Sequence, residues 1–265
     1  MRQDRGGPFQ SAVAFYDRYR LFYPRRLLDR VVALAGLVPG DSVLDLGTGT
    51  GMLAIGFAGA GMAVTALDPE PLMLDAAAER AAAAGVRVDF RRGGSCDLKI
   101  GMGPFRLVTM GRSFHWMDCA ATLAMLDGIV APGGGVALFH DAHPPVAENG
   151  WFKILCSIQD KYGRKLASAE RRAAEKGGGH RRYEPFLFAS AFSQLDGLSV
   201  TIRQALTAED IVGRALSTSL TSPKRLGEAK EAFVSDLTQA LRELSPDGTF
   251  TEVAELVALL ARRPQ

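Results

Sequence analysis

A short glycine-rich turn with the sequence GTGTG, Gly47–Gly51, is the part of the chain best suited to chemistry. The apolar run Ser42–Leu46 precedes it and the small residues of Met52–Ala60 follow it, so the pattern predicts a strand, a tight turn and a helix. Glycines at such a turn let backbone amides and the start of the helix approach a bound ligand closely. The turn therefore indicates a nucleotide-like cofactor, although a tight strand-to-helix connection can also use glycines for purely structural reasons.

Two acidic residues near this turn narrow the choice of cofactor. Asp45 stands just before the first glycine, where a carboxylate would crowd a dinucleotide pyrophosphate but would suit a cationic amino group. Asp68 ends the next predicted strand, Ala63–Leu67, and an acid at that place can accept hydrogen bonds from two ribose hydroxyls. A cofactor with an amino group at one end and a ribose further along fits both acids.

The same residues resemble the motifs of a known family. Residues 43–51, VLDLGTGTG, look like motif I of class I methyltransferases, and residues 66–69, ALDP, resemble their second motif. Residues 114–116 (FHW), residues 131–134 (APGG) and the lead-in Tyr19-Arg20…Tyr23-Pro24 resemble the small-molecule branch often called methyltransferase type 11. A less specific similarity over Thr207–Ser219 and the following helix extends the resemblance to nearly the whole chain. The resemblance implies an enzyme that transfers a methyl group from S-adenosylmethionine.

The resemblance also implies which residues hold S-adenosyl-L-methionine. Asp45 would lie near its amino group, Arg20 would pair with its carboxylate, and Asp68 would take the ribose. Many relatives carry an acid where this chain has Ser95, and another at the start of the fourth strand where it has Arg106, so Asp97 is the expected substitute at the adenine. The full set expected at the cofactor is Tyr19, Arg20, Asp45, Gly47, Thr48, Gly49, Asp68, Pro69, Ser95, Cys96, Asp97, Met110 and Gly111.

The methyl group on a sulfonium is already activated, so the protein mainly has to align a nucleophile with it. A hydroxyl nucleophile also benefits from a base, and His115, just past the fourth strand, is the first candidate. An equally open interpretation is that His115 and Trp116 pack under the cofactor and shape the pocket. The residues expected around the acceptor are Tyr16, Trp116, His140, His143 and Trp151, and no metal site is expected because no further ligands cluster near the two histidines after the fifth strand.

Two other groups of side chains have both a functional and a structural interpretation. The tyrosines of the lead-in could offer a π-face to the sulfonium, but tyrosines on an amphipathic helix more often simply pack. The basic stretch Lys161–Arg182 could attract an anionic substrate, yet acidic residues interrupt it and most such runs are solvated helix faces. A small-molecule acceptor, for which an anionic group is one option, is therefore expected as partner, with neither nucleic acid nor membrane.

The elements that must position these residues alternate between strand and helix. Further strands are predicted at Val86–Arg91, at Phe105–Met110, and at Val136–His140 after a turn at Pro132–Gly135, and an apolar run at Val253–Ala261 ends the chain. The family resemblance completes this pattern to a doubly wound Rossmann-like seven-stranded α/β sheet, mostly parallel with an antiparallel last strand, and with a helical lid. Within one domain over residues 1–265 we expect lid helices at 1–38, a cofactor-binding core at 39–147, an inserted cap at 148–198 and the rest of the core at 199–265.

Composition sets outer limits on these interpretations. With 265 residues, 47% hydrophobic residues and a formal charge of +2, the chain is typical of a folded globular protein without a strong field for polyanions. Three scattered cysteines and a polar beginning predict a cytoplasmic protein. A nicotinamide-dependent oxidoreductase remains an alternative, although the GxGxG spacing and Asp45 speak against it. A protein that binds S-adenosylmethionine without catalysing transfer is a second alternative.

Overall fold

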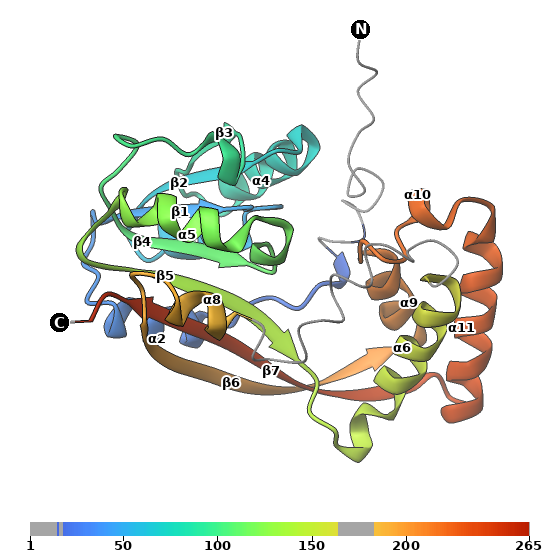
Figure 1. Ribbon diagram of the computed structural model, residues 1–265. Helices are drawn as coiled ribbons and strands as arrows, with labels where there is room; N and C mark the ends of the chain where they lie inside the picture. Colours follow the sequence, from blue (N-terminus) through green and yellow to red (C-terminus); the bar gives the residue numbers. More distant parts are fainter. Residues whose placement is uncertain (1–14, 16–17, 164–182, 265) are drawn as a thin grey trace, which may run out of the picture. The chain divides into compact units, whose positions relative to one another are not determined.

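The computed structural model describes residues 15, 18–163 and 183–264, and it contains a seven-stranded sheet (Figure 1). The strand order is β3-β2-β1-β4-β5-β7-β6. The pairs β1 with β2, β1 with β4, β2 with β3 and β4 with β5 are parallel, and β7 is antiparallel. This arrangement confirms the predicted Rossmann-like fold. The strands are β1 (Ser42–Leu46), β2 (Ala63–Asp68), β3 (Asp89–Arg92), β4 (Phe105–Gly111), β5 (Val130–Ala142), β6 (Gln194–Thr207) and β7 (Thr249–Arg262).

Helices connect most of these strands, as expected for parallel pairs that need a crossover. The helices of the described residues are α2 (Arg25–Leu34), α3 (Met52–Ala58), α4 (Pro71–Ala83), α5 (Cys119–Asp127), α6 (Gly150–Gly163), α8 (Glu184–Phe188), α9 (Ala208–Leu216), α10 (Pro223–Leu226) and α11 (Lys230–Leu244). Short 3-10 turns are η1 (Ser95–Asp97), η2 (Phe114–Trp116), η3 (Ala147–Asn149) and η5 (Gly227–Ala229).

The chain forms two compact units, and each is described by itself. The larger unit contains residues 22–141, 179–200 and 256–265, and therefore holds β1 to β4 and most of β5. The smaller unit contains residues 1–21, 142–178 and 201–255, and holds α6, α9, α10 and α11. Strands β6 and β7 each begin in one unit and end in the other. The predicted division into lid, core, cap and C-terminal part stays a prediction.

The core of the larger unit forms around the central parallel strands. In β1 every residue after Ser42 is buried, as expected for a strand covered on both faces. Leu44 and Leu46 of this strand join an apolar cluster with Val108 of β4, Leu138 of β5 and Leu123 of α5. Strands β1, β4 and β5 and helix α5 therefore share one apolar core.

The core of the smaller unit is helical. Phe233, Leu237 and Leu241 recur every four residues on α11 and are fully buried. They belong to a cluster with Trp151 and Leu155 of α6. The helical spacing of apolar and aromatic residues from Trp151 to Tyr162 predicts this helix.

Several predicted boundaries were wrong. Strand β5 begins at Val130 rather than after the predicted turn, because Pro132–Gly135 lies inside the strand as an irregularity in its pairing with β4. Strand β3 begins at Asp89, three residues later than predicted. The sequence pattern predicts a single helix over Lys224–Leu244, but this segment is divided into α10, η5 and α11 at Gly227, whose φ is +52°. Helices α5 and α8 were not predicted.

Candidate functional site

Backbone hydrogen bonds hold the glycine turn to the end of β2 and close its second half. The amides of Gly47 and Thr48 donate to the Leu67 carbonyl oxygen at 2.8 and 2.9 Å, and the amide of Gly51 donates to Thr48 at 3.0 Å. Gly47 has a φ of +73°, and a Cβ on it would come within 2.5 Å of the Ser113 Cβ, so only glycine fits there. Gly49 has a φ of +55° and its Cβ side faces open space. The turn thus offers a ligand an open approach to its backbone at Gly49.

Asp45 holds this turn to the neighbouring strand. Its side chain is 1% exposed, and its two oxygens accept hydrogen bonds from Thr48 Oγ1 at 2.6 Å and from Thr109 Oγ1 at 2.7 Å. Burial raises the pKa of Asp45 to about 6, because desolvation penalises the carboxylate more than these hydrogen bonds stabilise it. Asp45 therefore anchors the turn to β4 through Thr109, a residue that the sequence analysis missed.

Asp68 ties the end of β2 to the same turn. Its carboxylate accepts hydrogen bonds from the backbone amides of Gly49 at 2.8 Å and Glu70 at 2.9 Å. Burial raises the pKa of Asp68 despite these bonds. The Gly93 amide also donates to the Asp68 carbonyl oxygen at 3.1 Å, so the segment that leads into η1 lies beside the acid.

The residues expected to border the adenine, Pro69 and Ser95–Asp97, therefore lie at the same edge of the sheet as Asp68. Residues Ser95–Asp97 form η1 directly after β3, which pairs with β2. Cys96, Asp97 and Pro69 are exposed. The Asp97 carboxylate accepts a hydrogen bond from the Gly94 amide at 2.9 Å.

The end of β4 completes this edge. Met110 is 1% exposed, and beyond Gly111 the hydroxyl of Ser113 donates to the Leu46 carbonyl oxygen at 2.8 Å, which joins the ends of β4 and β1. Arg112 has a φ of +54°, a conformation rare for a residue with a side chain. Its guanidinium group pairs with Asp141, and lies 4.6 Å from the centre of the Tyr23 ring. In the sequence, only the position of Arg112 at the end of a predicted strand could have marked it as a candidate site residue.

His115 and Trp116 lie in η2, one turn further along the chain. Both side chains are exposed, and Nδ1 of His115 is 3.3 Å from the Tyr183 hydroxyl. Phe114 is buried against the Tyr183 ring. His140 is half-buried near the end of β5. These residues all belong to the larger unit.

The remaining predicted residues belong to the smaller unit. The Tyr19 hydroxyl donates to Glu209 at 3.0 Å, and Arg20 donates to the Ser217 carbonyl oxygen at 3.3 Å. His143 and Trp151 lie together, with ring centres 5.4 Å apart. Tyr16 lies outside the described residues, as does most of the basic stretch. That the predicted residues of the two units build one site stays a prediction.

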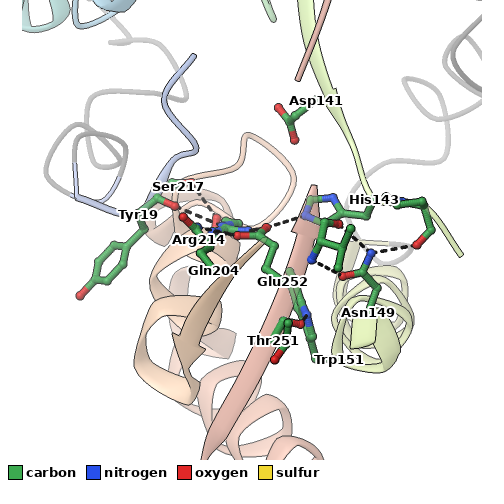
Figure 2. Close-up of polar contacts among 12 residues, drawn as sticks. Tyr19, Asp141, His143, Asn149, Trp151, Gln204, Arg214, Ser217, Thr251 and Glu252 are labelled. Atoms are coloured by element: carbon green, nitrogen blue, oxygen red, sulfur yellow. Dashed lines mark hydrogen bonds and ion pairs between the residues drawn. The ribbon is translucent and has the colours of Figure 1, made fainter. Parts of the chain in front are cut away.

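The smaller unit also contains a buried ionic group that the sequence analysis missed (Figure 2). Glu252 of β7 contacts both His143 and Arg214, and its side chain is fully buried. The alternation of β7 could have revealed it, because Glu252 takes an inward position between Phe250 and Ala254. Within the described ranges, no group of three or more His, Cys, Asp or Glu residues could hold a metal ion. No helix in the described part of the chain is long and apolar enough to span a membrane.

Comparisons with known proteins agree with this geometry. Residues 43–134 match the sequence model of the family described as Methyltransferase domain. The chain is 30% identical over 162 residues to an uncharacterised methyltransferase of Mycobacterium bovis, and the matched region covers 61% of this chain and 63% of that relative. The chain thus spans less than two thirds of the curated relatives it matches first.

Solved structures share the fold. A proposed type II methyltransferase from Anaeromyxobacter dehalogenans superposes with a TM-score of 0.64 at 19% identity, over 92% of this chain and 98% of that chain. A methyltransferase from Thiobacillus denitrificans in complex with S-adenosyl-L-homocysteine gives 0.51 at 20% identity, over 94% and 96%.

The fold and the glycine turn together define a Rossmann-like cofactor-binding protein. Within that class, residues 43–134 are similar to the methyltransferase domain family.

Proposed function

We propose that the protein transfers the methyl group of S-adenosylmethionine to an oxygen, nitrogen or carbon nucleophile of a small molecule. The observation that carries this proposal is the glycine turn held between Asp45 and Asp68, at the carboxyl edge of a parallel sheet where open α/β folds bind ligands. The acceptor class is proposed from the resemblance of the sequence to the small-molecule branch.

The chemistry of the donors and acceptors fits this cofactor. The amides of Gly47, Thr48, Gly49 and Gly51 already donate within the protein, so the turn suits a ligand that brings its own donors, such as an ammonium group. An ionised carboxylate has about four lone-pair sites, and Asp68 uses two of them on backbone amides. The others can accept the two ribose hydroxyls.

The rest of the proposed site follows the resemblance. Pro69 and Ser95–Asp97 would border the adenine, and the backbone at Met110 and Gly111 would face the methionine end. Tyr19 and Arg20 are retained as proposed contacts of the methionine end. The bound cofactor supplies a methyl group on a positively charged sulfur, so the residues of the chain need only orient the acceptor, exclude water and take up a proton where the acceptor carries one.

Binding and turnover measurements test the proposal. Calorimetry should detect binding of S-adenosylmethionine and S-adenosylhomocysteine and none of NAD. Incubation with methyl-labelled cofactor and a panel of hydroxylated, aminated and carbon-acid small molecules should then transfer label to at least one acceptor. Binding without any transfer would favour the inactive cofactor-binding alternative, and binding of NAD alone would favour the oxidoreductase.

A further inference from the structure

The carboxyl edge of the sheet in the larger unit carries an ion pair that the proposed site does not yet use. Arg112 directly follows β4, Asp141 lies near the end of β5, and their side chains pair across these two neighbouring strands (Figure 1). The side chains are 11% and 20% exposed, so the pair is largely buried. A buried ion pair usually adds little net stability compared with apolar residues of the same volume, so stability alone does not account for it.

The backbone of Arg112 adopts a conformation that side chains disfavour. Its φ is +54°, and it is the only non-glycine residue with a positive φ among those that the structure describes. Its amide donates to the Phe139 carbonyl oxygen of β5 at 2.9 Å, and the next residue, Ser113, packs against Gly47 of the glycine turn. Strained residues of this kind persist only where their surroundings hold them, and they are frequent at ligand-binding sites.

The guanidinium group of Arg112 lies beside the glycine turn. Its Nη1 is 4.0 Å from the sulfur of Met52, the residue that directly follows the turn and begins α3. Its Cζ is 4.6 Å from the centre of the Tyr23 ring, which packs edge-on against Phe139 at 5.2 Å. All of these residues and Asp141 belong to the larger unit. They fix a positive charge next to the turn that we propose to bind the cofactor.

The charges of this pair suit an amino-acid group. A guanidinium group presents five N–H donors in a planar fork, so one arginine can contact two carboxylates at once. The amino-acid end of S-adenosylmethionine carries a carboxylate and an ammonium group and is neutral overall. Such an end adds no net charge beside the pair, whereas a ligand with a single negative charge would be repelled by Asp141.

Resting on the proposed binding of S-adenosylmethionine, we infer that Arg112 binds the carboxylate of its methionine part through charge-assisted hydrogen bonds. The family resemblance implies Arg20 for this carboxylate, but Arg20 belongs to the smaller unit, where it donates to the Ser217 carbonyl oxygen. Arg112 belongs to the same unit as the glycine turn, and its contact is additional to that of Arg20.

Two ligands that differ only in this carboxylate test the inference. They are S-adenosylhomocysteine and its decarboxylated analogue, which keeps the amine, the thioether, the ribose and the adenine. In calorimetry, the wild-type chain should bind S-adenosylhomocysteine about 10- to 100-fold more tightly than the analogue. In Arg112→Asn, the affinity for S-adenosylhomocysteine should fall by about this factor, and the affinity for the analogue should stay unchanged. Asparagine adopts a positive φ more readily than most residues, so the substitution suits the backbone here.

Two further variants separate ligand binding from folding. Arg106→Asn is the matched control, because Arg106 lies at the other end of β4 and its Nε is 3.9 Å from an oxygen of Asp41. This variant should keep the wild-type preference for S-adenosylhomocysteine. The double variant Arg112→Asn/Asp141→Asn removes both charges of the pair, so no buried carboxylate is left without its partner. It should show the same loss as Arg112→Asn even if the single variant does not fold.

The outcomes distinguish the inference from the proposed function. Equal affinity of the wild type for the two ligands would overturn the inference and leave the cofactor proposal standing. An equal loss of both ligands in the Arg112 variants, or no loss of S-adenosylhomocysteine, would do the same. A wild-type chain that binds neither ligand would contradict the proposed function together with the inference.

Discussion

Asp45 and Asp68 flank the proposed cofactor site, yet both also hold the protein together. Asp45 accepts hydrogen bonds from two threonine hydroxyls, and Asp68 accepts them from two backbone amides. Each acid is buried and has a raised pKa. Substitutions here therefore change both stability and ligand affinity, and experiments have to separate the two.

The raised pKa of Asp45 predicts a pH-dependent cost in stability. Since the pKa rises from 3.8 to about 6 on folding, the protonated form favours the folded state, and this contribution is lost as pH rises from about 4 to 6. The loss amounts to about 3 kcal/mol. The Asp45→Asn variant has no titrating group at this position, so it lacks this pH-dependent contribution to stability. In urea unfolding, the free energy of unfolding of the variant minus that of the wild type should therefore increase from pH 4 to about pH 6. Between pH 6 and 7 this difference should stay constant. A stability difference independent of pH would contradict the assignment.

Asp68→Asn should weaken the binding of S-adenosylhomocysteine. The substitution removes the negative charge that strengthens hydrogen bonds to the ribose hydroxyls, each worth about 1.5 to 3 kcal/mol. Calorimetry measures the loss, and thermal unfolding checks that the variant remains folded. Asp75→Asn, on the exposed side of α4, serves as the matched control and should bind normally. Unchanged affinity in a folded Asp68→Asn protein would remove Asp68 from the proposed site.

At the scale of single residues, the sequence predicts the site residues whose contacts are close to them along the chain or in the next strand. Asp45 and Asp68 could be located because each is one of the last two residues of a strand beside the glycine turn. The contacts of Thr109, Arg112 and Glu252 could not be predicted, because their partners come from other strands or helices and the pairing of strands is a property of the complete sheet.

At the scale of elements, the central strands and most helices follow from hydrophobic pattern, and the errors occur where glycine is ambiguous. The sequence APGGG at residues 131–135 is typical of a turn, and a turn was predicted. In the structure Phe105 pairs with Val130 and Leu107 pairs with Gly135, so β5 inserts extra residues against β4 and continues. Such a bulge depends on the partner strand, which a local pattern does not contain.

The bulge gives a prediction for Gly134. A Cβ there would lie 2.8 Å from the Arg106 carbonyl oxygen and 3.0 Å from the Ala131 carbonyl oxygen, and neither backbone atom can move aside cheaply. Gly134→Ala should therefore destabilise the protein by about 1 to 3 kcal/mol in urea unfolding. Gly197→Ala in β6 is the control, since nothing lies within 4 Å of its Cβ position. Equal stability of the two variants would show that the bulge tolerates a side chain.

At the scale of the whole molecule, the sequence predicts the class of fold but not the two compact units. The reason is that β6 and β7 each contribute residues to both units, so no linker or change in composition marks a boundary. Each of these strands continues without a break from one unit into the other, so unfolding one unit frees the ends of the strand parts that the other unit contains. We therefore expect the chain to unfold in a single transition.

A cofactor that binds the larger unit should accordingly stabilise the whole chain. At 100 times its dissociation constant, S-adenosylhomocysteine should add about 2.7 kcal/mol and raise Tm by roughly 5 to 10 °C, and NAD should add nothing. Trp151 of the smaller unit is 0% exposed and Trp116 of the larger unit is 54% exposed, so the red shift of fluorescence on unfolding reports mainly the smaller unit. Circular dichroism reports both. Adding S-adenosylhomocysteine should raise the unfolding midpoints of both signals together. A fluorescence midpoint that stays unchanged while the circular dichroism midpoint rises would show that the units unfold independently.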